Sequence, residues 1–190
     1  MRRLLYCLMM LVLVLISCAK KEPIPLEALP SDYSFEDAIR DGIVLHKDGD
    51  IVSCKEAFHE FLGSVSKGES ASVRLGFYYT LDESRVTAEY YKENKDRYPV
   101  LYITDLTFDS ESYVTRRFEN GKELVREYKH MKYLPFYPKN VDADYERIEH
   151  YVLLNDDTVS SYDEIWRSLA SSRLGDYIEH MTVYSEYVRK

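Results

Sequence analysis

The chain has few glycines and few cysteines, and its histidines are scattered. Seven glycines are spread over 190 residues, so no glycine-rich loop that would cradle a phosphate is present. The motif Gly-x-Ser-x-Gly is missing, which excludes the nucleophile elbow of the α/β-hydrolases. No two of the five histidines stand four residues apart, so the helical zinc-binding pair is not found. The sequence therefore offers no catalytic motif, and we expect no cofactor.

The N-terminal segment has the charge order of a signal peptide. Arg2 and Arg3 precede an apolar run over residues 4–16, and Lys20 and Lys21 follow it. The run is shorter than the about 20 apolar residues that cross a bilayer. We therefore predict that residues 1–17 are a leader that is removed. The alternatives are an uncleaved anchor helix and a secretory leader that is cut elsewhere.

Residues 15–18 (LISC) resemble the cleavage and acylation site of bacterial lipoproteins. In such proteins the peptidase cuts before the cysteine, here Cys18, and a diacylglyceryl group is joined to its sulfur. Two or more acyl chains, palmitate among them, hold a protein stably at a membrane. The resemblance implies an extracytoplasmic protein that is lipid-anchored to the bacterial cell membrane at Cys18. It does not distinguish an inner from an outer membrane.

Only Cys54 would remain besides Cys18 after the leader is removed with Cys7, so the mature chain could form no internal disulfide. A chain of about 170 residues must then be stabilised by its core. Cys54 stands where a helix is predicted to begin, and it is either a reactive thiol or a small buried helix residue.

The formal charge is −8, and loss of Arg2 and Arg3 makes it more negative. Phosphates should be repelled, so we expect no nucleic-acid partner.

Proline-rich residues 19–30 follow Cys18 and are predicted to form a stiff tether. In an extended form of about 3.1 Å per residue they would hold the domain roughly 35 Å from the membrane. Together with Cys18 they make up an anchor segment, residues 18–30. We expect one α+β domain over residues 31–190.

Hydrophobic periodicity and turn signals predict the elements of this domain. Ser34 with Asp37, and Ser53 with Glu56, are the pairs expected at the starts of two helices. Asp48-Gly49 and Asn120-Gly121 predict tight turns between strands. The predicted class is α+β, a largely antiparallel sheet with two principal helices on one face. The helices are expected over residues 53–67 and 162–171, and the strands over 43–46, 51–52, 73–81, 100–108, 113–118, 124–128, 148–154 and 181–188, with 86–91 as an ambiguous strand.

Two segments, residues 43–77 and 151–185, share a weak similarity at a constant offset of 108 positions. The pair Ser53 and Glu56 matches Ser161 and Glu164. The similarity predicts either an internal duplication of a strand–turn–strand–helix–strand unit or a chance likeness between two capped helices that follow turns.

Tyrosine is unusually frequent, at 18 residues. The pairs Tyr78-Tyr79 and Tyr90-Tyr91, with Tyr133, Phe136 and Tyr137, could form an exposed surface for a glycan or an envelope protein. The other interpretation is cross-strand packing, which suits tyrosine in sheets.

One turn gathers groups that could bind a metal. His46, Asp48 and Asp50 surround it, and His59 or Glu60 could complete a site. A solvated acidic turn is the other interpretation, and the spacing does not fit a calcium loop. Cys54 and His59 are a possible nucleophile and base by residue type. They stand five residues apart on the predicted helix and so point in different directions, which means that they would not hydrogen-bond to each other.

Residues 33–120 resemble small uncharacterised lipoproteins of Gram-positive bacteria that carry a domain of unknown function. The likeness lies in residues 38–49, in residues 73–80 and in residues 99–109. It implies no catalytic or binding residues. We favour a non-enzymatic binding or interaction module in the cell envelope. The alternatives are an envelope hydrolase, possibly metal-dependent, that uses the groups near Asp48, and a solute-capture lipoprotein beside a transporter.

Overall fold

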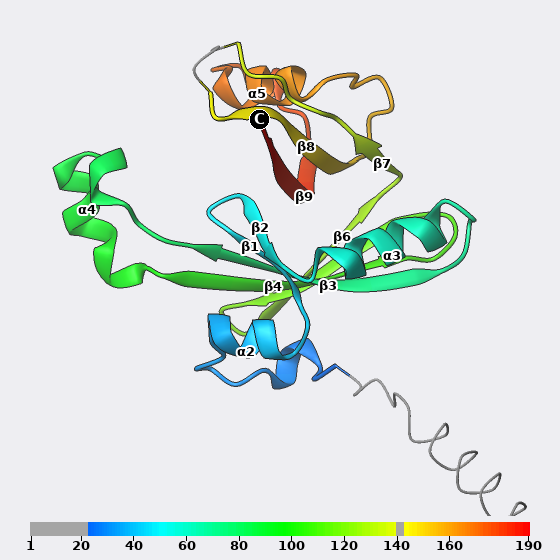
Figure 1. The fold of residues 1–190 in the computed structure, drawn as a ribbon, viewed down its shortest axis with the longest axis horizontal. Helices are drawn as coiled ribbons and strands as arrows, with labels where there is room; N and C mark the ends of the chain where they lie inside the picture. The colour runs from blue at the N-terminus through cyan, green and yellow to red at the C-terminus, as the bar shows by residue number, and fades with distance from the viewer. Residues whose placement is uncertain (1–22, 140–142) are drawn as a thin grey trace, which may run out of the picture.

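A computed structural model describes residues 23–139 and 143–190, which form two β-sheets with helices around them (Figure 1). The leader and Cys18 lie outside the described residues. The strands are β1 (Val44–Lys47), β2 (Asp50–Ser53), β3 (Ala71–Tyr79), β4 (Val100–Phe108), β5 (Tyr113–Glu119), β6 (Lys122–Tyr128), β7 (His130–Tyr133), β8 (Tyr145–Leu154) and β9 (His180–Arg189). The helices are η1 (Leu26–Ala28), α2 (Phe35–Arg40), α3 (Lys55–Val65), η2 (Glu83–Arg85), α4 (Ala88–Asn94), η3 (Lys95–Arg97), α5 (Tyr162–Ala170) and η4 (Leu174–Asp176).

The predicted α+β class with largely antiparallel pairing is confirmed, and the strands divide into two sheets. One has six strands in the order β2-β1-β3-β4-β5-β6, and the other has three in the order β7-β8-β9. β1 and β3 run parallel, whereas the other neighbouring strands are antiparallel. The crossover from β1 to β3 passes through β2 and α3, as a parallel pair requires.

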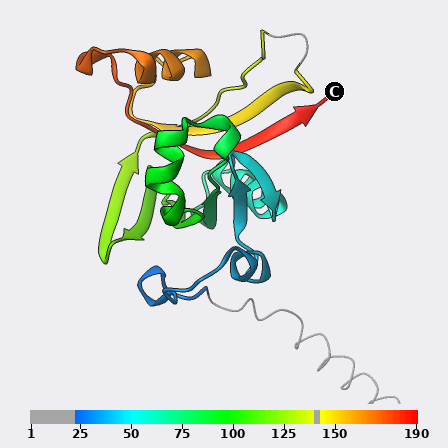
Figure 2. The same ribbon diagram turned by 90° about the vertical axis from the view of Figure 1, so that its left-hand side faces the viewer.

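The elements stack in layers, which the two views show from perpendicular directions (Figures 1 and 2). Phe58 of α3 packs with Val44 and Leu75 of the large sheet and with Leu153 of the small one. Helix α5 covers the outer face of the small sheet, where its Ile165 packs with Leu154. On the far face of the large sheet, η1 and α2 cover a third cluster that includes Leu45 and Ile103.

The sequence predicted that the two principal helices share one face of one sheet. The structure instead places them on opposite faces of the small sheet. Leu153 and Leu154 are adjacent on β8 and are both fully buried. Successive side chains of a strand point to opposite faces, so β8 needs cover on both sides. Helix α3 supplies it on one side and α5 on the other.

Two helix starts test the capping predictions. At α2 the predicted pair is confirmed, because Asp37 N–H donates to Ser34 Oγ at 3.1 Å and Ser34 N–H donates to Asp37 Oδ2 at 3.0 Å. At α3 the prediction is wrong. Ser53 is the last residue of β2, and its hydroxyl donates to Cys54 Sγ. Cys54, with φ +54°, is the residue before the helix and makes no side-chain cap.

Both predicted turns join antiparallel strands. Asp48 and Gly49 have φ of +50° and +93°, and Asn120 and Gly121 have φ of +51° and +72°. Two consecutive positive φ values match the right-handed twist of a tight hairpin, and Asn, Asp and Gly adopt them most readily. The expected meander of β4, β5 and β6 is confirmed.

The ambiguous segment at 86–91 forms no strand, and from Ala88 on it belongs to helix α4. Thr87 accepts a hydrogen bond from Tyr90 N–H at 3.3 Å and so caps α4. Helix α4 projects beyond the ends of β3 and β4 (Figure 1). A threonine cap followed by Ala88 and Glu89, which favour helices, explains the difference.

The tether is shorter than predicted, because residues 23–30 belong to the fold. Leu26 of η1 is buried in the cluster on the far face of the large sheet. Arg74 of β3 donates through Nη1 to the carbonyl oxygen of Ile24. Apolar Ile24, Leu26 and Leu29 among the prolines gain more from this packing than from remaining in water.

The two segments with offset similarity differ in topology. In the first, β1 pairs with β3 in parallel, whereas in the second the end of β8 pairs with β9 antiparallel. No strand corresponding to β2 stands between the Asp156 turn and α5 in the described chain. The likeness is therefore that of two helices that follow turns.

Candidate functional site

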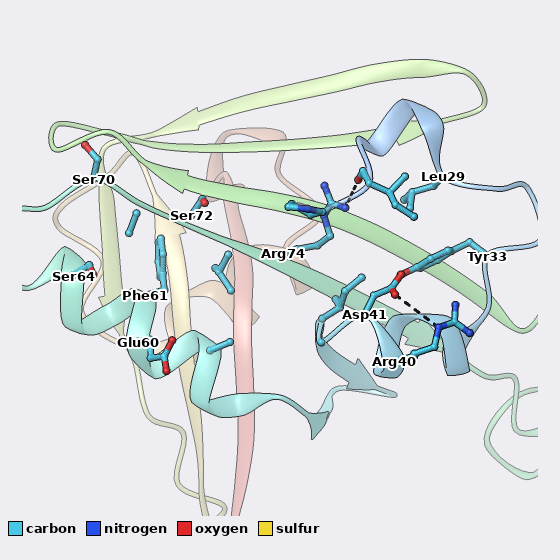
Figure 3. Close-up of a pocket in the computed structure, with 17 residues that line it drawn as sticks. Leu29, Tyr33, Arg40, Asp41, Glu60, Phe61, Ser64, Ser70, Ser72 and Arg74 are labelled. Carbon is cyan, nitrogen blue, oxygen red and sulfur yellow. Dashed lines mark hydrogen bonds and ion pairs between the residues drawn. The ribbon is translucent and has the colours of Figure 1, made fainter. Parts of the chain in front are cut away.

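One hollow is a groove of about 840 Å³ beside the start of β3 (Figure 3). Side chains of α3 stand on one side of it and those of the N-terminal segment on the other. The groove is lined by Pro23, Ile24, Leu29, Tyr33, Arg40, Asp41, Gly42, Ile43, Ala57, Glu60, Phe61, Ser64, Ser70, Ala71, Ser72, Val73 and Arg74.

The groove runs along an unpaired strand edge. β3 begins at Ala71, but its pairing with β1 begins only at Leu75. β4 pairs with the whole of β3 on the other side. On the groove side, no strand of the described residues pairs with residues 71–74, and alternate N–H and C=O groups of such an edge point outward.

The polar groups around the groove are held in place by one another. Arg74 donates to Asp105 through Nε at 2.6 Å and Nη2 at 2.8 Å. Tyr33 donates to Asp41 Oδ2 at 3.0 Å, and burial with this contact raises the pKa of Tyr33 to about 12. No histidine or cysteine is among the described residues that line the groove, so it offers surfaces for binding and no nucleophile–base pair.

A second, smaller hollow lies between the two sheets, and we call it the aromatic pocket. It has a volume of about 190 Å³. It is lined by His46, Gly49, Phe77, Tyr78, Tyr79, Tyr162, Thr182, Tyr184 and Ser185. Strands β1 and β3 therefore meet β9 and the first residue of α5 in this pocket.

The groups proposed for a metal site do not converge. Asp48 accepts from Thr80 N–H and Oγ1, both at 2.7 Å, and Asp50 accepts from Tyr187 N–H at 3.3 Å. His46 is buried, whereas His59 is exposed. Within residues 23–139 and 143–190, no group of three or more His, Cys, Asp or Glu side chains is placed to hold a metal.

A serine–histidine contact was not foreseen from the sequence. Ser185 Oγ lies 2.8 Å from His150 Nδ1. The two residues are on paired strands and 35 positions apart, so no local motif joins them. Burial lowers the pKa of His150 to about 4, and a base this weak would take up a serine proton poorly at neutral pH. The Tyr162 ring also stacks on His150 with centroids 3.7 Å apart, which suits a packed structural contact.

The tyrosines and Cys54 take mixed positions. Tyr133 and Tyr137 are exposed, whereas Tyr78 is half-buried against Phe35. Tyr133 also packs on Tyr151 with centroids 5.3 Å apart. Both interpretations of the aromatic residues therefore apply, at different positions. Cys54 is partly buried and is a free thiol.

No protein-family model, curated protein or solved structure matches this chain. The resemblance of residues 33–120 to small lipoproteins therefore stays a prediction. None of the helices in the described part of the chain has the length and apolar character needed to cross a membrane.

Proposed function

We propose that this protein is a lipid-anchored, extracytoplasmic binding module without enzymatic activity. Its groove takes an extended segment of another envelope protein, which adds as a strand to the free edge of β3. The observation that carries this proposal is the groove of about 840 Å³ that runs along residues 71–74 of that edge.

The side chains beside the edge favour a main-chain ligand. The lining includes several small residues, namely Ala57, Ser64, Ser70, Ala71 and Ser72. Small side chains let a second main chain approach closely. In strand addition, main-chain hydrogen bonds provide affinity, and pockets for alternate side chains provide specificity. Leu29 and Phe61 offer apolar surface for such side chains on the two sides of the groove.

The predicted anchor would keep the groove near the membrane. Pro23 and Ile24 line the groove, and Cys18 precedes Pro23 by five positions. Five residues of extended chain span about 16 Å. A lipid at Cys18 would therefore favour capture of segments that lie close to the bilayer.

The test is crosslinking of the tagged, full-length protein in intact cells with a groove-filling variant. Ser64 lines the groove, so Ser64→Tyr should block an added strand and remove the crosslinked partner. Ser66→Tyr is the matched control, because Ser66 ends the same helix and does not line the groove. We expect the control to retain the partner.

A partner that survives Ser64→Tyr would contradict the groove as its site. If no partner is crosslinked to any form, including the unanchored Cys18→Ala form, the proposed function is wrong.

A further inference from the structure

The aromatic pocket is a second site that is independent of the groove. β1 and β3 form one wall, and β9 with Tyr162 of α5 forms the other. An apolar cavity of about 150 Å³ in a protein takes one benzene molecule. The aromatic pocket, at about 190 Å³, therefore has room for one six-membered ring with small substituents.

The lining of the pocket is aromatic and uncharged. Phe77, Tyr79, Tyr162 and Tyr184 are among its walls, and none of the described residues that line it is a lysine, arginine, aspartate or glutamate. The face of an aromatic ring is electron-rich and attracts partly positive C–H groups. Such walls suit the C–H face of a sugar ring and offer nothing to balance a charged ligand.

Hydroxyl groups from the small sheet join these aromatic walls. Ser185 and Thr182 line the pocket from β9. Thr182 Oγ1 lies 3.4 Å from the Tyr162 hydroxyl, at the long end of hydrogen-bond distance. The Ser185 hydroxyl already contacts His150 Nδ1 at 2.8 Å, so the Thr182 and Tyr162 hydroxyls are the ones offered to a ligand.

His46 adds a buried donor, Nδ1, that makes no well-formed hydrogen bond to the described residues. Ser185 N–H donates to His46 Nε2 at 3.3 Å, so the neutral ring carries its proton on Nδ1. Nδ1 is buried without a hydrogen-bond partner among the described residues, and His46 is only 3% exposed. Burial lowers the pKa of His46 to about 4, and a backbone contact with Gly76 acts in the opposite direction.

A ligand in the pocket would relieve this arrangement. A buried polar group without a partner is costly, and the cost is removed when a partner is supplied. The His46 ring is held between Phe77, stacked at 5.2 Å, and Tyr184, edge-on at 5.7 Å. His46 lines the pocket, so a ligand there can bring an acceptor oxygen to this ring.

We propose that the aromatic pocket binds one neutral sugar ring, the terminal residue of an envelope glycan. The aromatic walls hold the C–H face of the ring, and Thr182, Tyr162 and His46 hydrogen-bond its hydroxyls. The charge-free lining selects neutral sugars over uronic acids and phosphorylated sugars.

The test is an NMR titration of the full-length protein with glucose, galactose and N-acetylglucosamine, with phenol as an aromatic probe. We expect saturable shifts of the Ser185 amide with at least one sugar. Thr182→Val keeps the shape of the side chain and removes its hydroxyl, so it should weaken sugar binding about fivefold to tenfold. Thr104→Val is the matched control, because Thr104 is fully buried and lies outside the pocket. It should leave sugar binding unchanged.

Two results would overturn the proposal. One is that phenol saturates the pocket while none of the three sugars shifts the Ser185 amide. The other is that sugar binding is equally strong in the Thr182→Val protein and the native protein, both shown to be folded by their spectra. The groove variant Ser64→Tyr should not change sugar binding, so this test and that of the proposed function can fail separately.

Discussion

Arg74 donates two parallel hydrogen bonds to Asp105 on the neighbouring strand, from Nε to Oδ1 at 2.6 Å and from Nη2 to Oδ2 at 2.8 Å. The two residues face each other across β3 and β4. The same guanidinium group donates through Nη1 to the carbonyl of Ile24. Because the Arg74 side chain is only 13% exposed, one residue ties the sheet to the segment that carries the predicted anchor.

Replacing Arg74 should therefore loosen the N-terminal segment as well as the sheet. In Arg74→Met, Asp105 loses its partner and Ile24 loses its donor, and we expect the free energy of unfolding to fall by about 2–3 kcal/mol. Urea unfolding measures this loss, and amide hydrogen exchange over residues 24–33 reports the release. Arg189→Met is the control, because the Arg189–Asp144 pair is exposed, and it should cost less than about 1 kcal/mol. Equal losses in the two variants would contradict a special role for Arg74.

Glycine 76 should tolerate no side chain. A Cβ atom at Gly76 would lie 2.6 Å from Leu45 Cδ1 and 3.4 Å from Ile103 Cδ1. Leu45 is fully buried, so it has little room to move, and Gly76→Ala should lower the free energy of unfolding by about 1–3 kcal/mol.

Gly63 gives the matched comparison for this substitution. It lies within α3, and a Cβ there meets no atom within 4 Å. Gly63→Ala should raise the free energy of unfolding by about 0.5–1 kcal/mol, because alanine favours the helix. Thermal melts of both variants decide the point, and destabilisation by Gly63→Ala or none by Gly76→Ala would contradict the packing described.

Stability should fall in mildly acidic solution because of two buried histidines. Burial lowers the pKa of both His46 and His150 to about 4, against about 6.5 in an unfolded chain. Between these pH values the two histidines bind protons in the unfolded state but not in the folded state. The free energy of unfolding should therefore fall as pH decreases from about 6.5 to about 4, by at most about 1.4 kcal/mol per pH unit for each histidine. Above that window neither histidine contributes to the pH dependence.

Urea unfolding at several pH values between 7.5 and 4.5 measures this slope. His150→Phe keeps a ring beside Tyr162 and removes one titrating group, so it should reduce the slope by about half. His59→Gln is the control for replacing a histidine, because the His59 side chain is exposed. Carboxyl groups such as Asp37, whose pKa is lowered chiefly by the Ser34 N–H bond, act at still lower pH. A slope that is the same in all three proteins would contradict the prediction.

Cys18 should decide where the protein is found in the cell. Cys18→Ala removes the sulfur that would be acylated, so we expect a protein that is either unprocessed or shed from the membrane. Cell fractionation followed by immunoblotting measures this, with Cys54→Ser as the control that should stay membrane-bound. Unchanged membrane association of Cys18→Ala would contradict the lipid anchor.

Local signals in the sequence were sufficient for features that depend on near neighbours. Ser34 and Asp37 are three residues apart, and the helix start that they predicted is confirmed. The Asn120-Gly121 turn was also found, because its positive φ values restrict which residues fit. Ser53 shows the limit of such signals, since its place in a strand outweighed its capping preference.

Only the tertiary structure decided which distant segments meet. His46 and Ser185 are 139 positions apart in the sequence. They come together because the two sheets and α3 bury their apolar side chains in one shared core. The unpaired start of β3 depends on where β1 begins, and the folding of residues 23–30 depends on apolar surface that β1 and β4 expose. The sequence by itself was enough to predict the cellular location of the protein and most of its local elements, because these depend on adjacent residues. The groove and the aromatic pocket depend on burial summed over the whole chain, which no single segment encodes.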